Sequence, residues 1–374
     1  MLEGEGLPAR VRRWAALILA ATMVVLAQVA CDGGVLVDGP SVRERVDGDW
    51  ARAYFTDPTD SNQVTNPEGG LGADLVWLID RAETSVDVAA YDFELPKVAY
   101  ALVAAHRRGV GVRLVTESDN FEGEALGLLQ EAGIPVVGDQ SDDGLMHNKF
   151  AVIDGQWVWT GSWNMTENGT RRNNNNVVLI ASTALAENYG VEFEEMMAGQ
   201  FGPTSPVNTP YPRVVITVES DDGQERQVEV ETLFAPEGEV AKEVIAEIEA
   251  AQDRIRFMSF VFTSEEIAQA MVARAEAGVV VQGVMESRSA GSPYSQYDRL
   301  RRAVHDVLLD GNPYIMHHKV IIIDDDTVIL GSYNFSRSAE TDNDENVLII
   351  HDRELAGAFV DEFGRVYERA REGE

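Results

Sequence analysis

The sequence predicts an α/β protein built from two similar halves, each a sandwich of a sheet and helices. A set of polar residues recurs at one spacing, in residues 147–164 and again in residues 317–334. Apolar stretches with helical spacing alternate with short β-branched runs in both halves of the chain. A chain of 374 residues, 45% of them hydrophobic, has enough apolar material for two cores. Such alternation within a duplicated chain favours one α/β sandwich per copy.

The N-terminal residues predict export from the cytoplasm. Basic residues precede an apolar run over residues 14–30, and Cys31, the single cysteine, follows this run directly. The arrangement resembles a bacterial lipoprotein signal, in which residues 1–31 form the signal peptide and Cys31 carries the lipid anchor. An ordinary cleavable signal and an uncleaved anchor fit the same run. We therefore expect a membrane-anchored lipoprotein of a bacterial cell envelope, or a secreted protein.

Composition divides the rest of the chain into four segments. Residues 32–65 are rich in Gly, Asp, Pro, Asn and Thr, and we expect a tether there. The two repeats then occupy residues 66–205 and 233–374. Between them, residues 206–232 hold two β-branched runs around an Asp-Asp-Gly sequence, which predicts a linker hairpin.

The elements of the two repeats follow in the same order. The paired elements are a helix near 75–82 and 244–251, a strand at 85–93 and 254–262, a helix ending at Gly109 and Gly278, and a strand at 110–117 and 279–286. The offset between the repeats is 169 residues at these glycines (278 − 109 = 169) and 170 at the first polar residue of each set (317 − 147 = 170). One residue is therefore gained in a loop between them.

Each polar set begins with a His-x-Lys sequence at the start of a β-branched, apolar run. Residues i and i+2 of a strand point to the same face, so the histidine and lysine of each set project together. An Asp, a Gly-Ser pair and an Asn follow at matching offsets. The complete sets are His147, Lys149, Asp154, Gly161, Ser162 and Asn164, and His317, Lys319, Asp324, Gly331, Ser332 and Asn334.

Together the two sets supply the groups that phosphoryl transfer requires. The reaction needs a nucleophile, an acid for the leaving oxygen, and donors around the equatorial oxygens. One set provides half of these groups, and two sets that face each other provide all of them. The sequence therefore predicts one active site at the interface of two halves that a pseudo-two-fold axis relates.

The sets resemble the signature of the phospholipase D superfamily, His-x-Lys-x4-Asp followed by Gly-Ser-x-Asn, and the resemblance covers about residues 70–370. It implies hydrolysis of a phosphodiester in two steps. One histidine attacks phosphorus and forms a phosphohistidine, while the other protonates the leaving alcohol and then activates water. The resemblance implies no metal and no other cofactor. Supporting roles are expected for Ser162 and Ser332, and structural roles for Asp154 and Asp324, which fall where each strand turns back.

One difference between the repeats concerns a Glu-Asn pair. In nuclease-like members of the superfamily, the Glu of such a pair orients the catalytic histidine. Glu345 follows His317 by 28 residues, and Asn175 follows His147 by the same distance (345 − 317 = 28; 175 − 147 = 28). A carboxylate partner raises the pKa of an imidazole. We therefore expect Glu345 to make His317 the acid and to leave His147 as the nucleophile. Alternatively, Glu345 only fixes the orientation of the ring.

The sequence leaves more than one substrate class open. A phospholipase D that releases phosphatidate and a head-group alcohol suits a membrane-anchored enzyme, and we favour it. A metal-independent endonuclease is the alternative, because the residues around the second set resemble the nuclease branch. The formal net charge of −33 opposes this alternative, since such a surface repels polyanions. Both motifs are intact, which disfavours a third hypothesis, a catalytically silent binding protein. The expected partners are a phospholipid or nucleic-acid phosphodiester and the membrane, and the expected state is a monomer.

Overall fold

A computed structural model of the protein describes residues 41–47, 49–60, 69–139, 144–219 and 225–373. The first repeat contains the elements β2 (Ala51–Phe55), α2 (Leu71–Ile79), β3 (Ser85–Ala90), α3 (Pro96–Arg108), β4 (Gly111–Thr116), η1 (Ser118–Asn120), α4 (Glu124–Glu131), β5 (Val136–Gly138), β6 (Lys149–Ile153), β7 (Trp157–Gly161), α5 (Glu167–Arg171), β8 (Asn176–Ala181), α6 (Thr183–Met197) and η2 (Gly202–Thr204).

The second repeat contains the same succession of strands. Its elements are β10 (Glu225–Ala235), α7 (Val240–Ala250), β11 (Arg254–Ser259), α8 (Glu265–Glu276), β12 (Val280–Met285), α9 (Ser287–Ala290), α10 (Tyr297–Val304), β13 (Val307–Leu309), β14 (Lys319–Ile323), β15 (Thr327–Gly331), α11 (Arg337–Thr341), β16 (Glu345–His351) and α12 (Arg353–Glu372). Two further strands, β1 (Ser41–Asp47) and β9 (Arg213–Glu219), extend its sheet.

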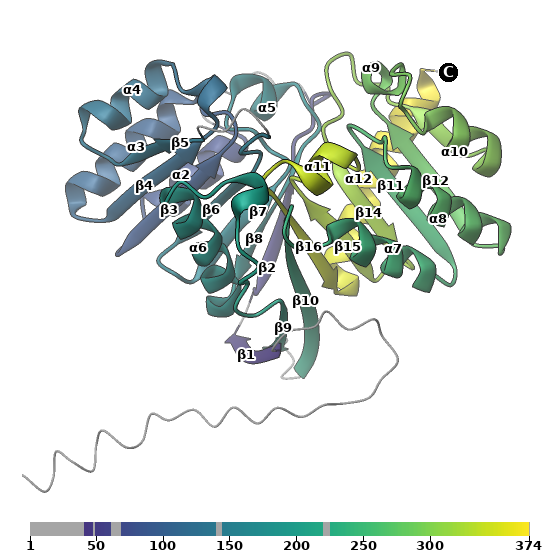
Figure 1. Ribbon diagram of the computed structural model, residues 1–374, viewed down its shortest axis with the longest axis horizontal. Helices are drawn as coiled ribbons and strands as arrows, with labels where there is room; N and C mark the ends of the chain where they lie inside the picture. Colours follow the sequence, from purple (N-terminus) through teal and green to yellow (C-terminus); the bar gives the residue numbers. More distant parts are fainter. Residues whose placement is uncertain (1–40, 48, 61–68, 140–143, 220–224, 374) are drawn as a thin grey trace, which may run out of the picture. The chain divides into compact units, whose positions relative to one another are not determined.

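The strands form one sheet per repeat (Figure 1). The order is β2-β8-β7-β6-β3-β4-β5 in the first sheet and β1-β9-β10-β16-β15-β14-β11-β12-β13 in the second. From β10 onward, the second order reproduces the first strand by strand. Both sheets are mixed, because β3 pairs in parallel with β4 and antiparallel with β6, and β11 pairs in parallel with β12 and antiparallel with β14. The predicted fold class, two similar α/β halves, is confirmed.

Alternation along the strands distributes apolar residues between separate cores. In β6, Ala151 and Ile153 join a core with α2, α3 and α4, and α7, α8 and α10 form the matching core on the second sheet. The alternate residues Phe150 and Val152 face a third core. No helix in the described part of the chain is both long and apolar enough to span a bilayer.

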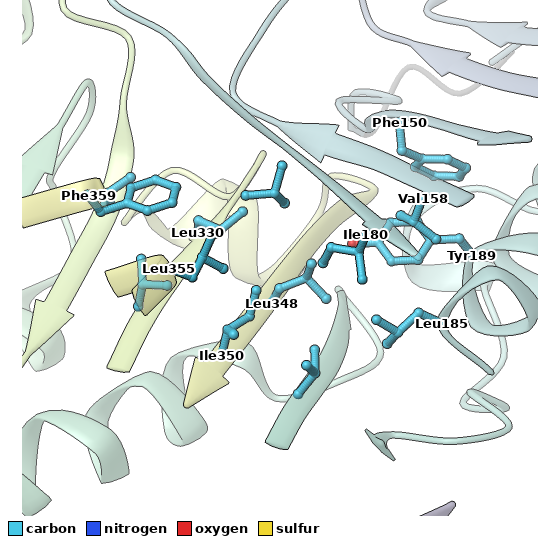
Figure 2. Packing of buried hydrophobic residues seen from close by; sticks show 14 of the residues in the cluster. Phe150, Val158, Ile180, Leu185, Tyr189, Leu330, Leu348, Ile350, Leu355 and Phe359 are labelled. Atoms are coloured by element: carbon cyan, nitrogen blue, oxygen red, sulfur yellow. The ribbon is translucent and has the colours of Figure 1, made fainter. Parts of the chain in front are cut away.

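The third core is shared by the two repeats (Figure 2). Phe150 and Tyr189 of the first repeat belong to the same buried cluster as Leu348 and Phe359 of the second. The closing helices of the repeats, α6 and α12, both contribute to this core. Helix α12 also contacts β2 of the other repeat. The two halves therefore bury apolar surface jointly, which holds their strand ends in a fixed relation at the site.

The segment expected to be a tether contains two strands, so that expectation is wrong for residues 41–47 and 51–55. Strand β1 pairs in parallel with β9, and β2 pairs antiparallel with β8. In β1, three charged residues separate Val42 from Val46, and both valines pack against the shared core. Residues 1–40 and 61–68, which include the apolar run and Cys31, lie outside the described residues.

The linker hairpin is part of the second sheet. Strands β9 and β10 pair antiparallel from Glu219 and Glu225 outward. Strand β10 continues to Ala235 and pairs with β16, as β2 pairs with β8 in the first sheet. Residues 225–235 therefore belong to the second repeat, and the hairpin is not a separate connection.

Candidate active site

The two halves exchange backbone hydrogen bonds beside each motif histidine. The N–H of His147 donates to the carbonyl of Asp344 (3.0 Å), and the N–H of His317 donates to that of Asn174 (2.9 Å). Isolated parallel β-bridges also join Met146 to Asp344 and Met316 to Asn174. The two contacts are equivalent, because their residues are related by the offset of 170 between the repeats (317 − 147 = 170; 344 − 174 = 170). Each histidine is therefore bound to the half that does not contain it.

Glu345 of the second half is the partner of His147 of the first. Its Oε2 lies 2.7 Å from His147 Nδ1 and accepts a hydrogen bond from the Ser332 hydroxyl at 2.6 Å. Asn343 donates to the other carboxylate oxygen, and Glu345 is fully buried. The expectation that Glu345 partners His317 is wrong. The bridges between the halves bring the start of β16 to the opposite histidine, which the offset within one repeat does not reveal.

Asn175 of the first half is the partner of His317 of the second. His317 Nδ1 lies 2.9 Å from the carbonyl oxygen of Ser162 and 3.0 Å from Asn175 Oδ1. The Asn175 amide nitrogen donates to Gly169, which leaves the amide oxygen facing the ring. Because both neighbours are acceptors, Nδ1 carries the proton of the neutral ring and Nε2 holds the lone pair. The Ser162 hydroxyl donates to Asn175, as Ser332 donates to Glu345.

Both motif lysines are buried beside their histidines. Lys149 Nζ donates to the carbonyl of His147 at 2.6 Å, and Lys319 Nζ donates to that of His317 at 3.0 Å. An ammonium that donates one N–H keeps two for a ligand oxygen. Burial lowers the pKa of Lys149 to about 7, with Glu345 and Asp92 opposing, and lowers the pKa of Lys319 well below its ordinary value.

The two imidazoles differ in basicity. Burial lowers the pKa of His147 to about 4, against the opposing effect of Glu345. Burial and then the two lysines lower the pKa of His317 well below its ordinary value. Each histidine is buried and retains 7% exposure. Positive charge is costly in this buried site, and an anionic phosphate would offset that cost and raise all four pKa values.

An aromatic ring lies against each histidine and lysine. The ring of Tyr91 is 4.8 Å from that of His147, and the ring of Phe260 is 4.6 Å from that of His317. The ammonium of each lysine lies 4.9 Å from the same aromatic ring. The sequence analysis did not identify these two residues. Their matching positions (260 − 91 = 169), at the ends of equivalent strands, are the signal that could have found them.

The two motif asparagines have buried amide oxygens without a partner in the described structure. These are the Oδ1 atoms of Asn164 and Asn334. The preceding glycines, Gly161 and Gly331, have φ of 157° and 151°. A Cβ at Gly331 would lie 2.1 Å from the carbonyl oxygen of Asn346, so a larger residue does not fit. This close approach positions the Gly-Ser-x-Asn segment against the neighbouring strand.

The motif aspartates lie at the far ends of their strands and hold turns together. Asp154 accepts hydrogen bonds from the backbone N–H groups of Glu83, Thr84 and Ser85. Asp324 does the same for residues 252–254. Both aspartates have positive φ, which Asp tolerates in a tight turn. They connect β6 and β14 to the start of the neighbouring strand and do not approach the histidines.

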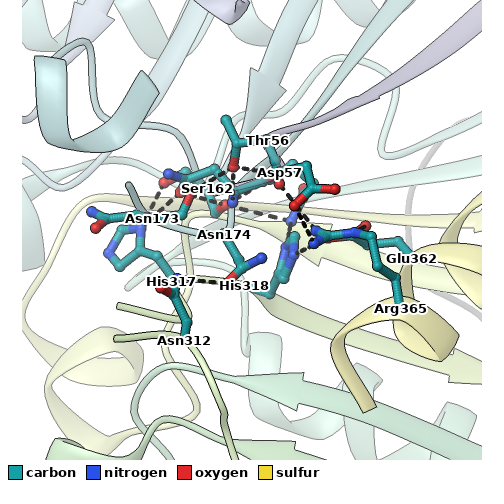
Figure 3. A network of polar contacts seen from close by, with 12 residues as sticks. Thr56, Asp57, Ser162, Asn173, Asn174, Asn312, His317, His318, Glu362 and Arg365 are labelled. Carbon is teal, nitrogen blue, oxygen red and sulfur yellow. Dashed lines mark hydrogen bonds and ion pairs between the residues drawn. The ribbon is translucent and has the colours of Figure 1, made fainter. Parts of the chain in front are cut away.

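A polar network anchors β14 behind the site (Figure 3). His318, on the opposite strand face from His317, lies 2.9 Å from Glu362 of α12. Arg365 donates to both oxygens of Glu362 and also reaches Asp57 and the carbonyl of Thr56. This network joins the second motif strand to the segment after β2 of the first repeat.

Comparison with known proteins finds matches to both halves. The domain family described as "Cardiolipin synthase, PLD-like domain" matches residues 75–197 and 244–367. The chain is 39% identical over 124 residues to the mitochondrial cardiolipin hydrolase of Xenopus tropicalis, a match that covers 33% of this chain and 59% of that protein. It is 36% identical over 131 residues to a phospholipase D of Rickettsia felis, covering 35% and 66%. The chain thus spans about half to two thirds of the length of the curated relatives it matches.

A solved structure agrees with the arrangement of both halves. The phosphatidylserine synthase of Haemophilus influenzae Rd KW20 matches with a TM-score of 0.58 at 13% identity. The match covers 80% of this chain and 84% of that one. At this identity the likeness shows the fold alone.

Proposed function

The chain belongs to the family of PLD-like domains, and from that membership we propose that it is a phosphodiesterase that hydrolyses a phospholipid to phosphatidate and a head-group alcohol. The meeting of both motifs in one buried site carries the proposal, because each histidine has its partner in the opposite half. The names of the relatives, cardiolipin hydrolase and phospholipase D, agree with a lipid phosphodiester as substrate.

In the first step, Nε2 of neutral His317 attacks phosphorus. The new P–N bond forms as the bond between phosphorus and the head-group oxygen breaks. Protonated His147 gives its Nε2 proton to that leaving oxygen, so the head group departs with a hydroxyl and not as an alkoxide. The phosphatidyl group remains on His317 as a phosphohistidine.

In the second step, water replaces the head group. His147, now neutral, removes a proton from the water as its oxygen attacks phosphorus. The P–N bond breaks, phosphatidate leaves, and both histidines return to their starting protonation states. One residue therefore acts as acid and then as base, as microscopic reversibility requires.

The assignment of roles depends on the two partner residues. A general acid must be protonated in the substrate complex, where the Glu345 carboxylate and the bound phosphate both favour the protonated form of His147. A nucleophile must be neutral, and the acceptors around His317 Nδ1 leave its Nε2 lone pair free. This assignment reverses the one expected from the sequence, by the same physical reasoning applied to the observed partners.

The remaining groups serve the phosphate. Lys149 and Lys319 supply positive charge for the equatorial oxygens, and the amides of Asn164 and Asn334 supply donors. These four groups perform the charge stabilisation that a divalent cation provides in other phosphodiesterases. We therefore propose catalysis without a metal.

A parallel assay distinguishes the lipid hydrolase from the endonuclease. Purified full-length chain in detergent is offered phosphatidylcholine micelles and single-stranded DNA, each with and without excess chelator. Release of choline that the chelator does not reduce is the expected result. DNA cleavage without choline release would establish the nuclease instead, and loss of activity that added divalent ions restore would overturn the metal-free mechanism.

We also propose that the enzyme acts from the outer side of a membrane, attached through Cys31. The position of Cys31 directly after the apolar run supports this location. Cys31→Ser should leave export intact and release the protein from membranes. If the variant stays in the membrane fraction, the apolar run itself is the anchor.

A further inference from the structure

Asp344 joins three segments of the chain beside His147. Its backbone carbonyl accepts the N–H of His147 at 3.0 Å, and its backbone N–H donates to the carbonyl of Leu145 at 2.9 Å. Its side-chain Oδ1 accepts the N–H of Gly202 in η2 at 2.7 Å. Asp344 is 1% exposed, and the next residue in the chain is Glu345, the partner of His147. One residue therefore contacts the backbone of the proposed acid and carries the partner of its ring.

Two glycines of the first half pack closely against the same segment. Gly202 has a φ of 53°, and a Cβ there would lie 2.7 Å from the carbonyl oxygen of Asp342. A Cβ at Gly144 would overlap the same oxygen. A change in the contact between Asp344 and Gly202 therefore acts on a closely packed backbone that also holds His147.

The ionisable groups around the Asp344 side chain are mostly carboxyls. Burial raises the pKa of Asp344 to about 8, against the hydrogen bond from Gly202, and three neighbouring carboxyls add to the rise. In the part of the chain that the structure describes, Asp344 forms no ion pair within 4.0 Å. The groups that act on Asp344 or border its bridge to Met146 are Asp139 after β5, Glu192 in α6, Glu237 after β10, Glu345 in β16, and Glu117 and His147 in the first half.

The equivalent position in the first half holds an amide. Asn174 (344 − 170 = 174) accepts the N–H of His317, and its Oδ1 accepts a hydrogen bond from the Asn312 amide at 2.7 Å. The position with cations nearby thus holds a neutral side chain, whereas the position among carboxyls holds an acid. The charged groups that line a small cavity with Asn174 are Arg365, Arg369 and Asp310.

A proton on Asp344 makes the two contacts between the halves alike. A buried carboxylate without a cation bears a desolvation cost, which one backbone hydrogen bond offsets only in part. Protonation removes the charge and leaves an oxygen that still accepts the N–H of Gly202. The neutral carboxyl then resembles the amide of Asn174 in shape and charge. Loss of the proton would add a negative charge among the carboxyls that already surround this segment.

We propose that Asp344 is a positioning residue that holds the proposed acid His147 and its partner Glu345 in place only while it is protonated. Its proton passes to solvent when the pH rises, and the contact between the halves beside His147 then loosens. The inference rests on the proposed function, in which His147 is the acid, and it adds control by pH to that function. The site is thus assembled in acidic and neutral surroundings and weakened in alkaline ones.

The first test is urea unfolding of the full-length chain in uncharged detergent micelles, followed by tryptophan fluorescence from pH 5 to pH 9. The folded pKa of Asp344, about 8, lies above the unfolded value of about 3.9, so the folded state binds one more proton between these values. The contribution of this proton to stability is therefore full below the unfolded value and is lost as the pH rises through the folded pKa.

The expected result is a pH-dependent difference between wild type and Asp344→Asn. The ratio of their unfolding constants, wild type over variant, should rise by up to about tenfold per pH unit between pH 5 and pH 8. Asp361→Asn removes an exposed carboxylate on α12 and is the matched control for net charge. The ratio of wild type to this control should stay flat.

The second test measures hydrolysis of phosphatidylcholine at pH 6 and pH 9. At pH 6, Asp344→Ala should lower kcat about tenfold with KM unchanged, because the Gly202 N–H loses its acceptor and His147 acts only in the transition state. Asp344→Asn keeps an acceptor and should restore kcat to near the wild-type value. Between pH 6 and pH 9, the kcat of Asp344→Asn relative to wild type should rise about tenfold, because the variant has no proton to lose.

Three results would overturn the inference. A wild type whose stability rises with pH relative to Asp344→Asn would show that Asp344 works as a carboxylate. Equal kcat for Asp344→Ala and Asp344→Asn would show that Asp344 does not position His147. Stabilisation of the wild type but not of Asp344→Asn by millimolar calcium at pH 9 would show that a cation, and not a proton, neutralises the segment. If Asp344→Ala does not fold, the comparison of Asp344→Asn with wild type decides the question.

The proposed function is checked separately with bis(4-nitrophenyl) phosphate. If the wild type hydrolyses neither this substrate nor phosphatidylcholine, the proposed function fails. The unfolding constants then still decide whether Asp344 is protonated in the folded chain.

Discussion

The carboxylate of Glu345 lies 2.7 Å from Nδ1 of His147, a residue 198 positions earlier in the chain. Its counterpart Asn175 reaches His317 by the same crossing between halves. A nearly symmetric frame thus holds two histidines with different partners, a carboxylate and an amide. This difference gives the proposed reaction a direction, because it separates the acid from the nucleophile.

Replacement of either histidine should abolish turnover. His147→Ala removes the proposed acid and His317→Ala removes the nucleophile, so each should lower kcat by about two orders of magnitude or more. Steady-state hydrolysis of the phospholipid is the measurement. Two independent sites would instead leave about half of the activity in each variant, and that result would contradict the shared site.

The covalent intermediate should form on His317. Acid quench during turnover, followed by mapping of the phosphorylated peptide, locates it directly. A nitrophenyl phosphodiester needs little help from an acid, so His147→Ala should retain its first step with this substrate and His317→Ala should not. A phosphohistidine at residue 147 would mean that Glu345 stabilises the positive charge of the intermediate, and the two roles would be exchanged.

Glu345→Gln should move the alkaline limb of the pH profile of kcat. His147 must be protonated to act as the acid, so kcat falls as the pH rises through its pKa in the substrate complex. The carboxylate raises that pKa, and its removal should shift the limb to lower pH by about one unit or more. The acidic limb, which reports neutral His317, should stay in place. A shift of the acidic limb alone would contradict the observed pairing.

Asp154→Asn should destabilise the fold by about 1–3 kcal/mol, because a carboxylate that accepts several backbone N–H bonds is lost. Partial burial raises the pKa of Asp154, but the hydrogen bonds outweigh this effect, and the pKa lies below its ordinary value. Its contribution is therefore present above the unfolded pKa of about 3.9 and is lost as the pH falls through the folded pKa. Urea unfolding at pH 7 and below pH 4 should show a difference from wild type that shrinks in acid.

Asp324→Asn is the matched variant in the second half and should behave alike. Asp361→Asn, exposed on α12, should change stability by less than about 0.5 kcal/mol. If both motif variants unfold like the wild type but lose activity, the motif aspartates have a catalytic role that their position does not indicate.

Local sequence patterns predicted much of the fold. The duplicated spacing predicted two similar halves, and β-branched runs after each His-x-Lys sequence predicted the strands β6 and β14. Period-two alternation placed His147 and Lys149 on one face, where both side chains lie against the ring of Tyr91. Such patterns act within a few residues, and covalent geometry transmits them directly.

Other features could not be predicted from the sequence, because they depend on pairing between strands that are far apart in the chain. Strand β1 pairs with β9 about 170 residues later, and its charged residues resemble those of a tether. Tyr91 and Phe260 gain their place at the site only when β3 and β11 end beside the motif strands. A polar or irregular composition does not reveal a strand whose partner is so far away.

By itself, the sequence predicted which groups the candidate site contains: two histidines, two lysines and two amides at fixed local spacing. Tertiary structure alone decided which partner each histidine received. The offset of 28 residues is the same in both repeats, and it suggests pairing within a repeat. The backbone bridges from His147 to Asp344 and from His317 to Asn174 cross the interface and carry the next residue of each strand to the opposite histidine. Hydrogen-bond register between the halves, which no local pattern encodes, therefore placed the carboxylate on His147.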